Sequence, residues 1–392
     1  MDLRDSHTGT GAAAPPRPLR NGCVARGAGI RGCLSAAAAF AAVKVLGLSA
    51  LVVYSTLRGE SAHVLLSARW DALWYVRITE HGYGVTVAAE DGRVLSDLAF
   101  FPLYPAAEKL VATLFLLPPG DAGLLVSAVA GALAAAGIYA VVVTFAPHRA
   151  ALLTAVLWAA CPVAVVQSMA YSESLFTALA AWALYCTRQR RWTTSGVLAC
   201  AAGLTRPVGV AVALAVWTAV GCAARRTGWT WRHVAACVLA PAGYVGYLLW
   251  VGGRTGGLLG YLDVQREWGN GFDAGLSFCL FLARLLDGPA FPAGLALLLG
   301  VVGLGLAYLA GLRQGYPLPV QVYTGVVVLL AMGTSGYFGS KPRLLIPAFA
   351  LLVPVAALLV AAPRGVRWAV LTALCAVSAG YGAVWLNGTG PP

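Results

Sequence analysis

Long apolar runs dominate the chain between residues 33 and 386, and short polar segments separate them. A helix needs about 20 residues, each adding about 1.5 Å, to cross roughly 30 Å of hydrocarbon. The pattern therefore predicts an all-α polytopic membrane protein with a bundle of about 11 transmembrane helices. The predicted spans are Cys33–Leu57, Gly123–Phe145, Ala150–Gln167, Ser174–Thr187, Thr194–Thr205, Pro207–Ala223, Val234–Val251, Pro292–Leu312, Val320–Ser335, Leu344–Ala361 and Val366–Leu386.

Charged residues interrupt the apolar pattern at two places. Lys44 lies inside the first span, so its ammonium group must reach the interface or face protein. The stretch Leu98–Leu117 carries Glu108 and Lys109 at its middle, and each charge would cost about 3 kcal/mol at a bilayer centre. We therefore predict an interfacial or re-entrant helix there, within a polar loop of residues 58–120.

Composition agrees with a membrane protein. Of the 392 residues, 59% are hydrophobic and only 11% are charged, whereas a soluble domain has about 25% charged residues. The mean hydropathy is +0.77. These values exclude a soluble globular enzyme, a disordered protein and a nucleic-acid-binding module. The net charge of +12 then indicates the positive-inside bias of membrane proteins, with no nucleic acid as partner.

The distribution of arginines predicts the topology. The region Thr194–Ala223 is either one helix kinked at Pro207 or two short helices, and only two short helices place the arginine clusters on one side. Residues 1–32 are then a disordered cytoplasmic tail, and residues 33–392 form one transmembrane domain. The C-terminus lies outside, and the host membrane is a bacterial plasma membrane, or the ER membrane in a eukaryote.

Six polar segments that mix aromatic and charged residues fall on the outer side in this topology. Because the inner loops contain mainly arginine, this difference predicts a single site at the outer face. The segments are Arg69–Tyr83, Phe100–Pro105, Tyr171–Ser174, Thr205–Pro207, Tyr261–Asp273 and Tyr337–Arg343.

The first of these segments has the periodicity of a helix that Gly82 would end. In such a helix Trp70 and Trp74 share one stripe, and Asp71 and Tyr75 lie beside it at i, i+4 spacing. Aromatic side chains favour the membrane–water boundary. An aspartate held among them is partly desolvated, which makes it a better proton acceptor.

A second interpretation of Asp71 is open at this point. Its carboxylate could form a structural ion pair with Arg69 or Arg77, which flank it in the same segment. The residue types alone do not decide between a base and an ion pair.

The polar segments also contain ordered motifs. They read Trp70-Asp71-x-x-Trp74-Tyr75-x-x-Ile78-x-x-x-Gly82-Tyr83, Phe100-Phe101-Pro102-Leu103-Tyr104-Pro105, Tyr171-Ser172-Glu173-Ser174, Thr205-Arg206-Pro207-x-Gly209, Val264-Gln265-Arg266-Glu267-Trp268 and Lys341-Pro342-Arg343-Leu344-Leu345-Ile346-Pro347. Together they resemble the PIG-V type mannosyltransferase family, within the GT-C superfamily of polytopic membrane glycosyltransferases. The resemblance covers roughly residues 33 to 350, and it is specific for the family but not for one substrate.

The resemblance implies a GT-C-like bundle and an inverting transfer of mannose, or another hexose, from a polyprenyl-phosphate donor. Asp71 matches the acidic residue that serves as catalytic base in the first outer loop. The acceptor would be a glycolipid or a glycoprotein on the non-cytoplasmic face. Neither the acceptor nor the oligomeric state follows from the sequence.

The departing lipid phosphate is an anion and needs cationic stabilisation. The candidate cations in the outer segments are Arg206, Lys341, Arg343 and Arg266. For Lys341 and Arg343 the alternative is simple snorkelling to the interface.

Other residues of the motifs are candidates for substrate binding. Glu173 would hold acceptor hydroxyls or orient Asp71, or it would simply suit a helix N-terminus. Gln265 would hydrogen-bond to a sugar and Trp268 would stack on its ring. Alternatively, Trp268 would simply pack at the membrane–water boundary. The remaining candidates are Trp70, Tyr75 and Tyr171.

We expect no essential metal and no cofactor beyond the lipid-linked co-substrate, because the first loop has no D-x-D pair and no cysteines form a C-x-x-C motif. A transporter or flippase of a lipid-linked substrate is the alternative function. Transporters often have internal repeats and charges near the bilayer midplane. This chain has no clear repeat, and its charges other than Lys44 lie at the boundaries.

Overall fold

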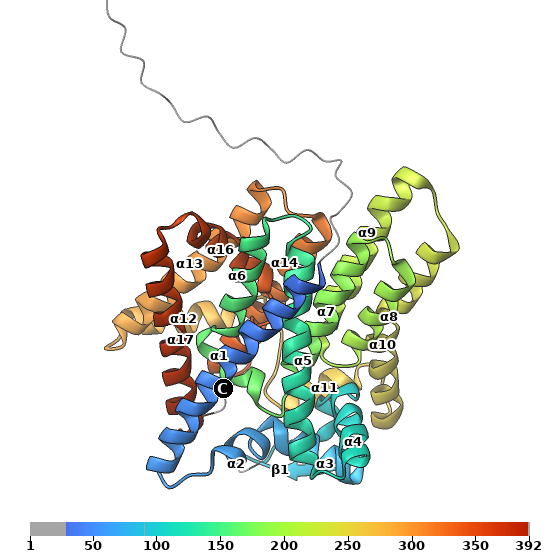
Figure 1. Cartoon of the computed structure of the whole chain (residues 1–392). Helices are drawn as coiled ribbons and strands as arrows, with labels where there is room; N and C mark the ends of the chain where they lie inside the picture. Colours follow the sequence, from blue (N-terminus) through green and yellow to red (C-terminus); the bar gives the residue numbers. More distant parts are fainter. Residues whose placement is uncertain (1–28, 90, 391–392) are drawn as a thin grey trace, which may run out of the picture.

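The computed structural model describes residues 29–390 except residue 90. In this part the chain forms seventeen α-helices, five 3-10 helices and one two-stranded sheet, which confirms the predicted all-α architecture (Figure 1). Residues 1–28 of the predicted tail lie outside the described part of the chain. The first helix begins at Ile30, slightly earlier than the predicted start at Cys33.

Among the described residues, six helices are long and apolar enough to cross a membrane. They are α1 (Ile30–Leu57), α5 (Pro119–Val142), α9 (Val210–Thr227, with its preceding turn η3, Pro207–Gly209), α10 (Trp231–Thr255), α13 (Phe291–Arg313) and α17 (Arg364–Leu386).

Two further candidate spans are broken by bends of 80°. One consists of α6 (His148–Ala159) and η2 (Pro162–Ser168). The other runs from η4 (Phe338–Ser340) and α15 (Lys341–Leu344) into η5 (Phe349–Leu351) and α16 (Leu352–Ala361).

Three of the predicted spans are short helices: α7 (Glu173–Arg188), α8 (Trp192–Gly203) and α14 (Leu318–Gly333). All the predicted apolar segments are therefore helical, and Thr194–Ala223 forms two separate helices, as the arginine distribution predicted. The number of crossings by length and composition is six, or eight if each bent pair is one span, rather than about eleven. The difference arises because a break or a short helix still gives an apolar run.

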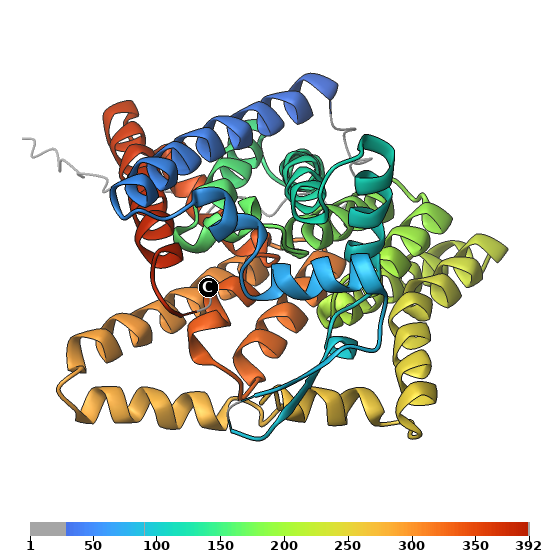
Figure 2. The same ribbon diagram turned by 90° about the horizontal axis from the view of Figure 1, so that it is seen from below.

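The polar loop after α1 folds at one end of the bundle, which we call the loop end (Figures 1 and 2). The stretch Leu98–Leu117 contains a helix that is too short to cross a membrane, as predicted. The β-hairpin in the same loop and the apolar helix α12 were not predicted. In the hairpin, Val87 pairs with Leu95 in antiparallel register. The elements beyond the spans are α2 (Ala62–Ser67), α3 (Asp71–His81), β1 (Thr86–Ala88), β2 (Val94–Ser96), η1 (Asp97–Ala99), α4 (Leu103–Phe115), α11 (Gly260–Glu267) and α12 (Leu276–Asp287).

Lys44 supports the break between α6 and η2. Its ammonium group donates to the carbonyl oxygens of Ala159 at 3.0 Å and Ala164 at 2.9 Å. In hydrocarbon, backbone carbonyls freed by a broken helix need such partners. Lys44 therefore faces protein, which is one of the two alternatives that the sequence allowed.

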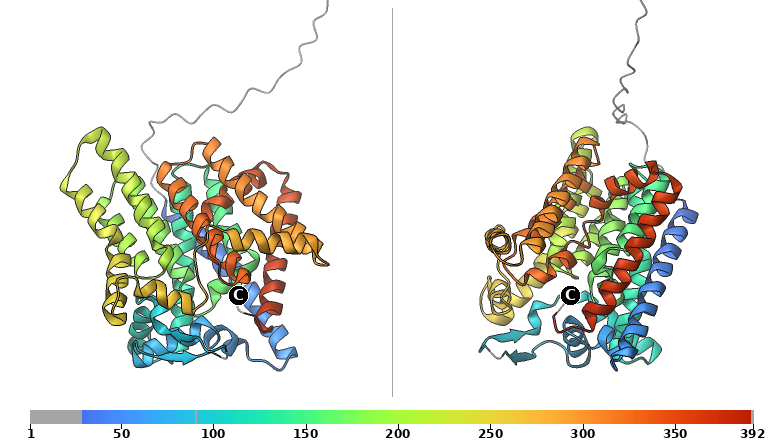
Figure 3. Two further views of the ribbon diagram at one scale, coloured as in Figure 1. Left: turned by 180° about the vertical axis from the view of Figure 1, so that it is seen from behind. Right: turned by 90° about the vertical axis from the view of Figure 1, so that its left-hand side faces the viewer.

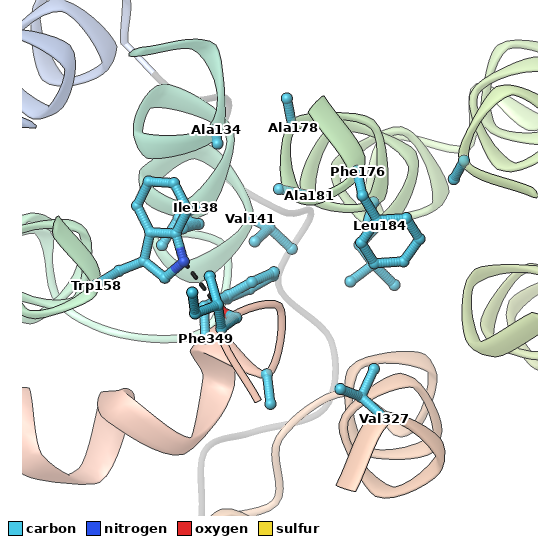
Figure 4. Close-up of a cluster of buried hydrophobic side chains, with 14 of the residues drawn as sticks. Ala134, Ile138, Val141, Trp158, Phe176, Ala178, Ala181, Leu184, Val327 and Phe349 are labelled. Carbon is cyan, nitrogen blue, oxygen red and sulfur yellow. Dashed lines mark hydrogen bonds between the residues drawn. The ribbon is translucent and has the colours of Figure 1, made fainter. Parts of the chain in front are cut away.

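The central core forms where α5, α6, α7, α14 and η5 meet (Figure 4). Trp158 and Phe349 are fully buried there, and the indole of Trp158 donates to the carbonyl of Ile346 at 3.0 Å. This bond ties the two broken spans to each other.

Helices α8, α9 and α10 form a layer at one side of the bundle (Figure 3). Glycines let α8 and α10 approach closely: a Cβ at Gly243 would overlap the carbonyl of Cys200, and one at Gly203 would lie 2.7 Å from the amide of Tyr244. Small residues serve this purpose at membrane helix interfaces. Because α8 leads directly to Arg206, this packing also places that side chain.

Gly243→Ala is expected to destabilise the protein by about 1–3 kcal/mol, because backbone atoms of α8 cannot yield to the added methyl group. Thermal unfolding in detergent measures the effect. Gly246→Ala is the matched control in the same helix, since a Cβ there meets nothing within 4 Å. Equal melting temperatures for the two variants would contradict the close packing.

Candidate functional site

Helix α3 begins at Asp71 and ends at Gly82, whose φ of 75° suits glycine. The predicted helix and its stop are therefore confirmed, but Trp70 precedes the helix with φ 51° and ψ −119°. A bulky residue in such a conformation costs about 1–3 kcal/mol. The amide of Asp71 donates to the hydroxyl of Tyr171 at 3.3 Å, which links this helix start to the segment before α7.

Four charged side chains meet beside this helix start. Arg343 contacts both Asp71 Oδ2 through one terminal nitrogen and Glu173 Oε1 through Nε, the latter at 2.5 Å. Arg206 lies 2.5 Å from the same Glu173 oxygen. The two carboxylates and two guanidinium groups balance each other in charge, as buried ions require.

The two carboxylates differ in access to solvent. The Asp71 side chain is 24% exposed, whereas the Glu173 side chain is 1% exposed. A ligand that arrives from outside can therefore reach Asp71 but not Glu173 without rearrangement. Glu173 serves to hold the two arginines in place.

Hydroxyl groups complete the cluster. Tyr75, one turn after Asp71 in α3, donates to Ser172 Oγ at 2.9 Å. Arg206 donates to the same oxygen at 3.1 Å. The Tyr171 ring lies under the guanidinium of Arg343 at 4.6 Å, which stabilises the cation.

The residues of this cluster come from four segments far apart in the sequence. The start of α3 provides Asp71, the start of α7 provides Glu173, the turn between α8 and η3 provides Arg206, and α15 provides Arg343. Four of the six polar segments therefore meet at one place, and both arginines belong to the predicted set of cations.

The other two predicted cations lie in different surroundings. Lys341 donates to the carbonyls of Ala331, Met332 and Thr334 at 2.7–3.2 Å, so carbonyls at the end of α14 take up its ammonium hydrogens. Arg266 is 68% exposed and pairs with Asp263 at 2.5 Å. Neither contacts the cluster in the described part of the chain.

Gln265 and Trp268 contact residues of the outer loops and none of the four charged residues of the cluster among the described contacts. Trp268 packs against Trp74 with ring centroids 5.1 Å apart and donates to the carbonyl of Ser96 at 3.0 Å. Gln265 donates to the hydroxyl of Tyr261 at 2.8 Å. The contacts of Trp268 are those of a packed boundary residue, the alternative that the sequence left open.

Asp71 does not pair with either arginine of its own segment. The guanidinium of Arg69 stacks on the Trp70 ring at 4.2 Å, and that of Arg77 lies 5.3 Å from the Trp74 ring. The local ion pair considered for Asp71 is therefore wrong, and its partner is the distant Arg343.

Ser172 accepts two of the hydrogen bonds in the cluster, although only its segment, Tyr171–Ser174, and not the residue itself, was predicted to have a role. No role was predicted for Ser127 either, which donates to the Tyr171 carbonyl at 3.0 Å and contacts Tyr104 at 2.9 Å. A serine in an apolar helix gives only a weak signal, so only the fold reveals these contacts.

Glu108 lies behind the site in α4. It is fully buried, and neither carboxylate oxygen has a hydrogen-bond partner among the described residues. Burial raises the pKa of Glu108 from 4.5 to about 8, and the nearby Glu80 adds to the increase. The group therefore prefers its protonated form in the folded protein.

The stability of the protein is expected to fall as the pH rises from about 5 to 8, because the unfolded chain releases the Glu108 proton at a lower pH than the folded chain does. Glu108→Gln should remove this pH-dependent part of the free energy of unfolding. Its size is at most about 1.4 kcal/mol for each unit by which the pKa differs between the folded and unfolded states. Melting temperatures across the pH range test this. Glu60→Gln, at an exposed position of the same loop, is the control and should keep the wild-type slope.

In the described part of the chain, no group of three or more His, Cys, Asp or Glu residues is placed to hold a metal ion. The site is built from ion pairs and hydroxyl groups. Its chemical capacity is therefore proton transfer at Asp71 and anion binding at the arginines.

The sequence matches no protein-family model and no curated protein. Among solved structures, ArnT from Cupriavidus metallidurans, bound to undecaprenyl phosphate, is similar with a TM-score of 0.53 and 16% identity. The match covers 85% of this chain and 61% of ArnT, so the chain spans less than two thirds of the length of that protein.

Two structures of the Archaeoglobus fulgidus oligosaccharyltransferase are more distant. The apo form has a TM-score of 0.47 at 14% identity and covers 88% of this chain and 56% of the transferase. The complex of AglB with an inhibitory peptide and a dolichol-phosphate has a TM-score of 0.46 at 16% identity and covers 89% and 56%.

The chain has the GT-C fold. The resemblance to the PIG-V type family remains a prediction from the motifs. The charged cluster therefore belongs to a polytopic membrane protein, and α3, which provides Asp71, lies at the loop end of the bundle (Figure 1).

Proposed function

We propose that this chain is a membrane glycosyltransferase. It transfers a hexosyl residue, which the motifs indicate is mannose, from a polyprenyl-phosphate donor to a glycolipid or glycoprotein acceptor. The observation that carries the proposal is that Asp71, an accessible carboxylate, pairs with Arg343, while the buried Glu173 holds both Arg343 and Arg206.

The fold supports a lipid-linked donor. ArnT, which shares the fold, was solved with undecaprenyl phosphate bound. A lipid phosphate reaches the loop end laterally from the bilayer, and a membrane-boundary pair of arginines suits its head group. The non-cytoplasmic location of this face and the cytosolic N-terminus follow from the arginine distribution and are part of the proposal.

The geometry allows the following step. Asp71 accepts the proton of the acceptor hydroxyl while its oxygen attacks the anomeric carbon. The bond between that carbon and the phosphate oxygen breaks, and its electron pair leaves with the lipid phosphate. The attack from the opposite face inverts the anomeric configuration, and the proton on Asp71 later passes to water.

Arg206 is the better placed of the two arginines to bind the departing phosphate. In the described part of the chain, only one of its terminal nitrogens is engaged, by Glu173 and Ser172. Arg343 instead uses two nitrogens on two carboxylates. Arg206 therefore retains free N–H donors for an incoming phosphate. Arg343 holds the Asp71 carboxylate in position beside that phosphate.

Asp71→Asn is expected to lower transfer by about 100-fold or more, because the amide cannot accept the acceptor proton. The measurement is transfer of radiolabelled mannose from polyprenyl-phosphate-mannose to the lipid and protein fractions of membranes. Asp91→Asn, an exposed position in the same loop that pairs with Arg93, is the control. Full transfer by Asp71→Asn in a correctly inserted protein would remove Asp71 from the role of base.

Arg206→Ala is expected to raise the apparent KM for the donor about tenfold or more, since a charged hydrogen bond is worth about 1.5–3 kcal/mol. The apparent KM for the acceptor should change less. Arg225→Ala, exposed in the last turn of α9, is the matched control. An unchanged donor KM for Arg206→Ala would assign the phosphate to another group.

A further inference from the structure

The residue before Asp71 has an unusual backbone. The amide of Ala72 donates to the carbonyl of Arg69 at 3.1 Å, so these residues form a tight turn around Trp70 and Asp71. With φ 51° and ψ −119°, Trp70 occupies the first central position of a type II′ turn. Glycine dominates this position, because a Cβ is strained there. A tryptophan persists only if its surroundings hold it.

Arg69 provides the hold on one side. Its guanidinium lies 4.2 Å from the centre of the Trp70 ring. The same group donates to the carbonyl oxygens of Leu386 at 2.7 Å and Gly388 at 3.1 Å. Arg69 thus links the strained turn to the last carbonyls of α17, which a helix end leaves without partners.

The end of α17 is itself fixed. Leu386 is fully buried, and the side chain of Asn387 donates to Ser55 Oγ at 2.9 Å in α1. On the other side of the turn, the Asp71 amide donates to the Tyr171 hydroxyl, and the Arg343 guanidinium donates to the Asp71 carboxylate. The strained residue therefore lies between two anchored groups.

We propose that Arg69 is a positioning residue for glycosyl transfer. Its guanidinium stacks on the Trp70 ring while it donates to the carbonyls at the end of α17, and this clamp keeps the positive φ that points the Asp71 carboxylate toward Arg343. Without the clamp, Trp70 relaxes to negative φ and the carboxylate moves out of line with the acceptor hydroxyl. The inference rests on the proposed role of Asp71, but the strain itself is testable without activity.

The first test compares Trp70→Gly with Trp70→Ala, which both remove the ring. At an ordinary position alanine is the more stable residue, whereas at positive φ glycine is. We expect Trp70→Gly to melt at a higher temperature than Trp70→Ala. The reverse order would show that no strain exists at this turn and would overturn the proposal.

The second test is a double-mutant cycle on transfer. Arg69→Ala should lower kcat at least about tenfold, with the donor KM within about threefold, because the carboxylate is misplaced but the phosphate site is intact. In the W70G background the same Arg69→Ala change should lower kcat by less than about threefold, since glycine adopts the turn without a clamp. Arg58→Ala, exposed at the end of α1, is the control.

Equal fold losses from Arg69→Ala in the two backgrounds would reduce Arg69 to an anchor for the C-terminal helix and overturn the proposal. If W70G proves too weak to assay, the same cycle is measured by melting temperature, where Arg69→Ala should cost less in the W70G background. If the wild-type protein transfers no sugar from the donor, the proposed function fails, and the two melting comparisons still decide the clamp.

Discussion

The Arg343 guanidinium between Asp71 and Glu173 is the interaction on which the rest of the site depends. A charge removed from water is tolerated only when it is paired and hydrogen-bonded, and loss of one partner leaves the other uncompensated. Glu173 is shared with Arg206, so each group in the cluster depends on the others. This mutual dependence joins α3, α7, α15 and the turn after α8 into one unit.

Much of this arrangement could be predicted from the sequence. The length of the apolar runs gives the helices, and the spacing of Asp71 and Tyr75 places both on the face of α3 that meets Ser172 and Arg343. The end of α3 at Gly82 follows from glycine's tolerance of positive φ. The grouping of polar segments on one side of the membrane gave the meeting of Asp71, Glu173, Arg206 and Arg343, although not their pairing.

Other features left no readable signal. An apolar run does not show where its helix breaks, so the 80° bends after α6 and before η5 were missed. The turn residues Asp91 and Gly92 are typical of a hairpin, but the flanking strands are only three residues long. Charge alone also did not reveal which arginine would find a buried partner, as Arg343 did, and which would stay exposed, as Arg266 did. The strain at Trp70 is invisible because no glycine marks it.

Several basic residues bind the carbonyl ends of helices, a role that the positive-inside rule does not anticipate. Lys44 caps α6, Lys341 caps α14, Arg69 caps α17 and Arg367 caps α16 with bonds to Leu359 and Val360. Cations favour the negative end of the helix dipole, and a membrane offers few other partners for those carbonyls.

The Arg69 guanidinium donates to the carbonyl of Gly388, in the segment that follows α17. Arg69 is two residues before Asp71, so this segment lies close to the start of α3. A polypeptide fused after Gly388 would emerge beside the turn that leads to Asp71. An affinity handle or fluorescent reporter attached there would crowd the charged cluster, whereas one placed ahead of α1 would join the bundle at its opposite end (Figure 1).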